Sequence, residues 1–81
     1  MIVDARGLRC PLPIIRLAAV ARTTAPGTEI TLLWTDPAAR HDVPAWARMR
    51  GHALVPGREA EQAGDDDAPA WSTTVLVGPG D

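Results

Sequence analysis

The amino-acid sequence predicts an α/β fold whose elements follow the order β-α-β-α-β-β. Runs of apolar and β-branched residues alternate with stretches rich in helix-forming residues, and glycine or proline separates them. The 81 residues suffice for one domain with a modest core. Because a strand, a helix and a second strand in succession form a right-handed crossover, we expect the first two strands to be parallel.

The first half of the chain predicts a strand, a helix and a strand. Ile2 and Val3 form a short apolar run that stops at Gly7, as in a first strand. Residues 11 to about 22 are apolar and rich in Leu and Ala, and both prolines fall in the first turn, where a missing N–H costs nothing. Residues 28–35, TEITLLWT, predict a central strand that is covered on at least one face.

A second helix is expected before Gly51, and its start is the open question. Asp36 and Pro37 suit a helix start, but Pro44 deep inside a helix would cost about 3 kcal/mol. We therefore expect a late start, with Asp42 as the N-cap and Pro44 in the first turn; the alternative is a short irregular turn before the helix. The residues expected to share the face of this helix are Val43, Trp46, Ala47 and Arg50.

Two further strands and a loop complete the prediction. Residues 52–56, HALVP, predict a short third strand, and residues 71–77, WSTTVLV, alternate as a fourth. The polar and acidic residues 57–69 between them predict a solvated hairpin loop. The three tryptophans are the only aromatic residues, so we expect them to fill the core.

The composition of the chain argues against several classes of function. The net charge is −2, which argues against a nucleic-acid interface, although all eight basic residues are Arg and a local contact with RNA stays open. No apolar run is long enough for a membrane span, so we expect a cytoplasmic protein. We also expect a monomer. His41 and His52 lack a metal-ligand spacing with the single cysteine, so no metal or cofactor is expected.

Chemistry-bearing residues follow the first two predicted strands. Arg9 and Cys10 come after the first strand, and Asp36 and Arg40 come after the second. Because both strands end at the same edge of the sheet, where open α/β sheets place ligands, these side chains should gather there.

Cys10 is the only cysteine, and it directly precedes Pro11 and the first helix. A lone cysteine is usually an inert core residue. Here the positive end of the helix dipole, worth up to about 2 kcal/mol or about 1.5 pKa units, should favour a thiolate, and Arg9 should add to the effect. Pro11 and Pro13 should hold the turn rigid. A presented sulfur of this kind can accept a sulfane sulfur by exchange chemistry.

Two stretches carry a family resemblance. The segments DARGLRCPLPIIRL and TDPAARHDVPAWARMRGH, the second at residues 35–52, resemble the TusA/SirA-like family of small sulfur-carrier proteins, whose hallmark is a C-P-x-P motif at the start of the first helix. The resemblance covers about residues 2–55. It implies an α/β two-layer sandwich with a four-stranded mixed sheet and two helices on one face, as a single TusA-like domain over residues 1–81.

The resemblance also implies a sulfurtransferase-like role in which Cys10 carries a persulfide. A sulfur-donor protein such as a cysteine desulfurase or a rhodanese would load it, and an acceptor protein would take the sulfur; tRNA thiolation, molybdenum-cofactor assembly and sulfur oxidation all fit. Two alternatives stay open: an RNA- or protein-binding module with an incidental cysteine, and a thiol redox sensor. The residues expected to shape the site or contact partners are Arg6, Arg9, Pro11, Pro13, Asp36 and Arg40.

Overall fold

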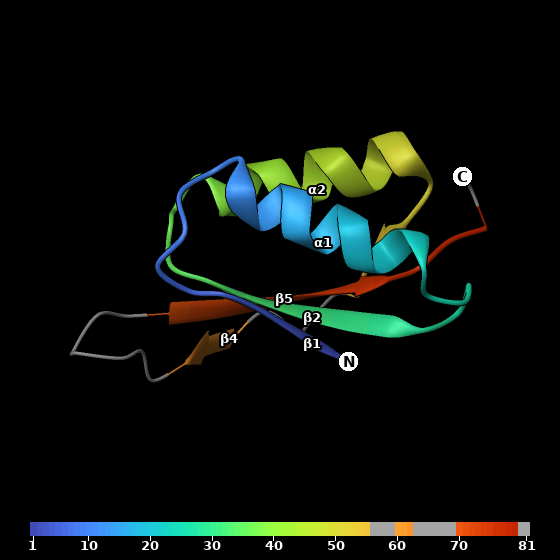
Figure 1. Cartoon of the computed structure of the whole chain (residues 1–81), viewed down its shortest axis with the longest axis horizontal. Helices are drawn as coiled ribbons and strands as arrows, with labels where there is room; N and C mark the ends of the chain where they lie inside the picture. Colours follow the sequence, from blue (N-terminus) through green and yellow to red (C-terminus); the bar gives the residue numbers. More distant parts are fainter. Residues whose placement is uncertain (56–59, 63–69, 80–81) are drawn as a thin grey trace.

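The computed structural model describes residues 1–55, 60–62 and 70–79. Figure 1 shows both helices packed on one face of the sheet, so the predicted two-layer α/β sandwich is confirmed. The helices and strands are β1 (Ile2–Ala5), α1 (Leu12–Arg22), β2 (Glu29–Trp34), α2 (Ala39–Arg50), β3 (Ala53–Leu54), β4 (Ala60–Gln62) and β5 (Ala70–Leu76).

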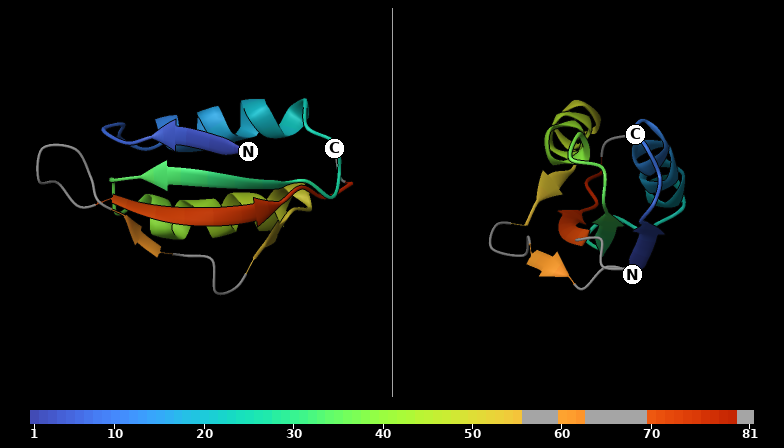
Figure 2. Two further views of the ribbon diagram at one scale, coloured as in Figure 1. Left: turned by 90° about the horizontal axis from the view of Figure 1, so that it is seen from below. Right: turned by 90° about the vertical axis from the view of Figure 1, so that its left-hand side faces the viewer.

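The sheet is mixed and has the strand order β1-β2-β5-β3 (Figure 2). β1 and β2 are parallel, as predicted, with Ile2 opposite Thr31. β5 runs antiparallel to β2 and places Trp71 opposite Trp34. β3 pairs with the end of β5, at Val75 and Leu76. The parallel pair sends the C-terminal ends of β1 and β2 to one edge, where both helices begin (Figure 1).

A further strand, β4, pairs antiparallel with the first residues of β5. It comprises residues 60–62, which lie inside the predicted solvated loop 57–69, so the loop prediction is wrong for these three residues. The backbone N–H and C=O groups of β5 are available to pair with residues 60–62. Such backbone pairing does not require an alternating pattern of apolar and polar residues in the sequence. Residues 57–59 and 63–69 of the predicted loop lie outside the described residues.

The core lies between the helix layer and the sheet. α1 buries Pro13, Leu17 and Ala21, which are spaced four residues apart on one face. α2 buries a similar stripe, and Trp46 packs half-buried beside it. The fully or nearly buried residues that the two layers share are Val3, Ala5, Ile30, Leu32, Trp34, Ala39, Val43, Ala47, Val75 and Val77.

α2 begins earlier than the sequence predicts. It starts at Ala39, so Asp42 is not its N-cap and Pro44 lies inside the helix. The Asp36 side chain accepts the Ala38 N–H at 3.0 Å, and the Asp36 carbonyl accepts the Ala39 N–H at 3.0 Å, which forms a turn that leads directly into the helix. The early start also places Ala39 in the core, and this burial offsets the hydrogen bond that Pro44 cannot donate.

Candidate functional site

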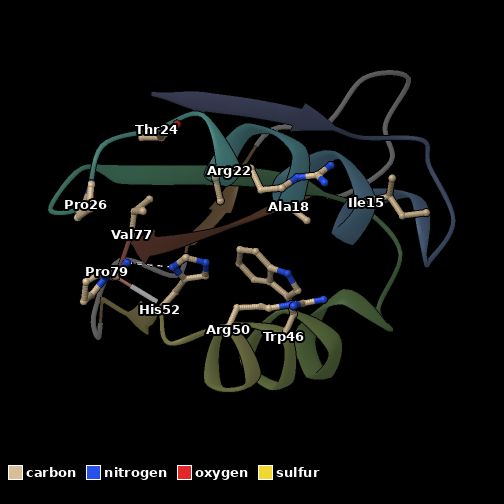
Figure 3. Close-up of a pocket in the computed structure, with 12 residues that line it drawn as sticks. Ile15, Ala18, Arg22, Thr24, Pro26, Trp46, Arg50, His52, Val77 and Pro79 are labelled. Atoms are coloured by element: carbon tan, nitrogen blue, oxygen red, sulfur yellow. Dashed lines mark hydrogen bonds between the residues drawn. The ribbon is translucent and has the colours of Figure 1, made fainter. Parts of the chain in front are cut away.

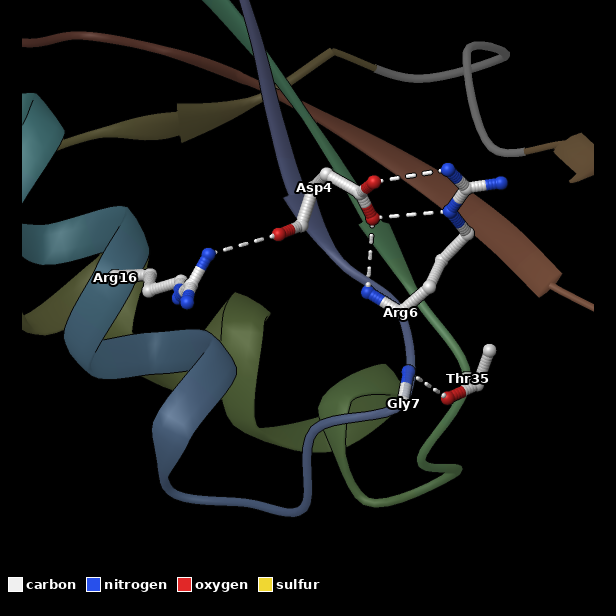
Figure 4. Close-up of polar contacts among 5 residues, drawn as sticks. All are labelled: Asp4, Arg6, Gly7, Arg16 and Thr35. Atoms are coloured by element: carbon white, nitrogen blue, oxygen red, sulfur yellow. Dashed lines mark hydrogen bonds and ion pairs between the residues drawn. The ribbon is translucent and has the colours of Figure 1, made fainter. Parts of the chain in front are cut away.

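Two loops meet where β1 and β2 end, and side-chain hydrogen bonds join them. The Gly7 N–H donates to Thr35 Oγ1 at 2.9 Å (Figure 4), and the Cys10 N–H donates to Asp36 Oδ2 at 2.8 Å. Gly7 has a φ of 81°, a left-handed conformation that other residues adopt with difficulty. The loop that follows β1 is therefore tied, at two points, to residues that lie 26 to 28 positions further along the chain.

Cys10 lies beside the first turn of α1, directly before the N-cap residue Pro11. It is half-buried and packs against the edge of the core. The Cys10–Pro11 peptide bond is cis. Pro11 is exposed, whereas Pro13 is fully buried, so Pro13 contributes to the core as well as to the shape of the turn.

The pKa of the Cys10 thiol is raised to about 11, so the prediction of a favoured thiolate is wrong. Burial is the largest cause, because desolvation penalises the charged form. The thiol also donates a hydrogen bond to the Asp42 carboxylate, and the negative charges of Asp42 and Asp36 act in the same direction.

The start of α1 also offers Cys10 few free N–H groups. The favourable end of a helix dipole is made of unpaired N–H groups in the first turn. Pro11 and Pro13 have no N–H, and the Leu12 N–H already donates to the Arg9 carbonyl at 2.9 Å. The two prolines that start the helix thus remove donors that would have stabilised a thiolate.

Asp36 connects the site residues. Its pKa is lowered, first by the N–H of Cys10, then by the N–H of Ala38, with a smaller contribution from the charge of Arg9. Asp36 is therefore a carboxylate that holds the Cys10 backbone in place and starts the turn before α2. Arg9 is exposed and acts electrostatically on Asp36.

Arg6 and Arg40 are held away from the thiol. Arg6 forms a bidentate pair with Asp4 on β1, with Nη2 2.8 Å from Oδ2 and Nε 2.9 Å from Oδ1 (Figure 4). Its guanidinium thereby lowers the pKa of Asp4 to about 2, mainly through the side-chain hydrogen bond. Arg40 lies over the stacked Trp34 and Trp71 rings, 5.7 and 5.8 Å from the two centroids.

Asp42 is the site residue that the sequence analysis missed. The expected late start of the second helix assigned it to the N-cap, where its side chain would have been occupied by the helix itself. Because α2 starts at Ala39, Asp42 lies instead in the first turn and faces Cys10. The alternative considered from the sequence, in which a short irregular turn precedes the helix, is closer to the observed turn at Asp36 before Ala39.

Among residues 1–55, 60–62 and 70–79, no cluster of three His, Cys, Asp or Glu side chains is arranged to hold a metal ion. Within this described part of the chain, the helices are too short and too polar to cross a membrane.

The fold and the site define a small α/β sandwich protein with one cysteine beside the start of a helix. Two carboxylates, one from a loop and one from the second helix, interact with this cysteine. The sequence profile described as "Sulfurtransferase TusA" matches residues 1–65. The chain belongs to the TusA family.

Relatives and a solved structure agree with this membership. The "Sulfur carrier protein TusA" of Pseudomonas paraeruginosa (strain DSM 24068 / PA7) is 41% identical over 63 residues, which cover 78% of this chain and 77% of that protein. The protein of the same name from Pseudomonas putida (strain W619) is 38% identical. The crystal structure of a SirA-like protein from Desulfitobacterium hafniense superposes with a TM-score of 0.66 at 26% identity, covering 96% of this chain and 99% of that one.

Proposed function

We propose that this protein is a sulfur carrier that holds a persulfide on Cys10 and passes the sulfane sulfur from a donor protein to an acceptor protein. Family membership supports the carrier role, since its relatives are named sulfur carrier proteins. The observation that carries the proposal is the position of Cys10. It is the only sulfhydryl of the chain, and Asp36 fixes its backbone at the shared edge of the strand ends.

The loading step needs no added oxidant or cofactor. The Cys10 sulfur attacks the terminal sulfur of a persulfide on the donor protein, and a new S–S bond forms as the S–S bond within the donor breaks. The donor cysteine leaves as a thiolate. The proton of the Cys10 thiol passes to the departing donor thiolate, so charge and protons are conserved in the step. In the delivery step, an acceptor thiolate or an activated acceptor attacks the outer sulfur, and Cys10 leaves as the thiolate.

Burial and the acidic neighbours keep Cys10 protonated in the free protein. Because only the thiolate attacks a disulfide or persulfide sulfur efficiently, the raised pKa slows reaction with stray electrophiles. A donor protein that brings positive charge to Asp36 and Asp42 would lower the Cys10 pKa within the complex. Arg9, exposed next to Asp36, is then placed for contact with the partner.

The raised pKa also bears on the two alternatives. A redox sensor needs an accessible, low-pKa thiol that peroxide oxidises to a sulfenic acid. Cys10 is half-buried and has a pKa of about 11, which disfavours that role. A nucleic-acid-binding module is disfavoured by the net charge of −2.

The test is whole-protein mass spectrometry after incubation with a cysteine desulfurase and cysteine, or with a rhodanese fed with thiosulfate. The wild type should gain the mass of one sulfur atom, and dithiothreitol should remove it. Cys10→Ser should gain nothing under either condition. A folded wild-type protein that stays unmodified with both kinds of donor would overturn the carrier proposal.

A further inference from the structure

A cavity of about 490 Å³ lies between the C-terminal halves of α1 and α2, close to the end of β5. Figure 3 shows its walls. Its main lining residues are Ile15, Ala18 and Arg22 from α1, Trp46 and Arg50 from α2, and His52 after α2. Cys10, Asp36 and Asp42 do not line it, so the cavity is separate from the thiol site.

Among the described residues, the charged side chains that line this cavity are cationic. Arg22 and Arg50 occupy the last turns of the two helices, and no acidic side chain from the described part of the chain lines the walls. Among the described residues, no carboxylate lies within ion-pair distance of either guanidinium. The helix layer as a whole carries five arginines and only one acidic residue, Asp42, although the chain carries a net charge of −2. This local excess of positive charge favours an anionic ligand.

The apolar wall between the arginines is held in place. Trp46 is half-buried, and the His52 ring packs on it with centroids 4.8 Å apart and an interplanar angle of 33°. The Gly78 N–H donates to His52 Nδ1 at 2.9 Å, which fixes the His52 ring (Figure 3). Gly78 itself has no room for a side chain, because a Cβ there would lie 1.8 Å from the Gly51 carbonyl oxygen. Trp46 therefore presents a preorganised aromatic surface to the cavity.

We propose that this cavity binds a small organic anion, with its anionic group between Arg22 and Arg50 and its flat apolar body against Trp46. The volume falls in the range of small-molecule sites, about 300 to 1,000 Å³. Guanidinium groups recognise planar carboxylates by paired hydrogen bonds, and an aromatic wall beside them selects for an apolar body. The site is a binding site in addition to the sulfur relay at Cys10 and does not depend on it.

The test uses three probes in NMR titrations of the ¹⁵N-labelled full chain. Indole-3-acetate has both a flat aromatic ring and a negative charge. Tryptamine has the same ring with a positive charge, and acetate has the negative charge without the ring. Indole-3-acetate should bind saturably with half-saturation at about 1 mM or below, as expected for a ligand of this size. Its largest shifts should fall on the Trp46 indole N–H, the His52 amide and the Gly78 amide. Tryptamine and acetate should each bind at least tenfold more weakly.

Charge-matched variants complete the test. The double variant Arg22→Ala/Arg50→Ala should lose at least tenfold in affinity for indole-3-acetate. The double variant Arg16→Ala/Arg48→Ala removes the same charge from the same two helices outside the cavity, so it should bind within twofold of the wild type. Cys10→Ser should bind as the wild type does, whatever the outcome of the sulfur-loading experiment. Equal binding of tryptamine, or an equal loss in the two double variants, would overturn the proposal.

Discussion

At the residue scale, Cys10 lies between two carboxylates that come from different parts of the chain. Asp36 accepts its backbone N–H, and Asp42 accepts its S–H. With a pKa of about 11, only about one thiol in 10⁴ is ionised at pH 7. The chemistry of the site in the free protein is therefore controlled by these neighbours more than by the dipole of α1.

Replacing Asp42 with Asn should make Cys10 more reactive. The substitution removes a negative charge and the charged acceptor that holds the proton, so the Cys10 pKa should fall towards its usual range. Iodoacetamide alkylation followed from pH 6 to pH 11 should show a lower midpoint and a rate at pH 7.5 that rises about tenfold for each unit of change. Asp4→Asn removes the same charge far from the thiol and is the matched control. An unchanged midpoint in Asp42→Asn would show that burial alone raises the pKa.

At the element scale, α2 forms around a proline. Pro44 cannot donate to the Arg40 carbonyl, and its ring crowds that carbonyl. The helix nevertheless begins at Ala39 because the stripe of Ala39, Val43 and Ala47 is buried against the sheet. Burial of one helix face thus outweighs the local preference of one residue.

Pro44→Ala should stabilise the protein by about 1 to 2 kcal/mol. Alanine restores the missing hydrogen bond and suits a helix interior. The greater conformational freedom of the unfolded chain reduces this gain in stability by about 0.4 to 1 kcal/mol. Urea unfolding at neutral pH measures the difference. Pro37→Ala changes a proline that is exposed before the helix, so it should not stabilise the protein. A loss of stability in Pro44→Ala would mean that the packing of the ring outweighs the hydrogen bond.

At the scale of the whole molecule, the titration of Cys10 is coupled to folding. The folded protein has a Cys10 pKa of about 11, against 9.0 for the unperturbed thiol. Because the folded state binds this proton more tightly, the contribution to stability is fully present below pH 9 and is lost as the pH rises towards 11. The chain contains no Lys and no Tyr, the other side chains that ordinarily titrate in this range. Cys10 is thus the side chain that titrates between pH 9 and 11.

The free energy of unfolding of the wild type should therefore fall between pH 9 and pH 11. Urea unfolding at half-unit steps across this interval measures the fall. In Cys10→Ser the same interval should be nearly flat, because no other side chain changes its protonation there. A wild-type curve as flat as that of the variant would show that the Cys10 pKa is the same in the folded and unfolded states.

Local features determined much of this protein from the sequence alone. The apolar run at residues 28–35 and the two prolines after Cys10 placed β2 and the start of α1, because strand pattern and backbone stiffness act over a few residues. The order of the elements made β1 and β2 parallel and brought Cys10 and Asp36 to one edge, since chain connectivity restricts the possible topologies.

The tertiary structure alone decided the start of α2, the strand β4 and the chemistry of the thiol. Burial of Ala39 against the sheet outweighed the local cost of Pro44, and the edge of β5 provided partners for residues 60–62. The packing of α2 beside α1 brought Asp42 to Cys10, 32 positions away in the chain. A pKa depends on the charges and the desolvation that surround a group in three dimensions. The neighbours of Cys10 in the sequence therefore predicted a lowered pKa, whereas its neighbours in space raise it.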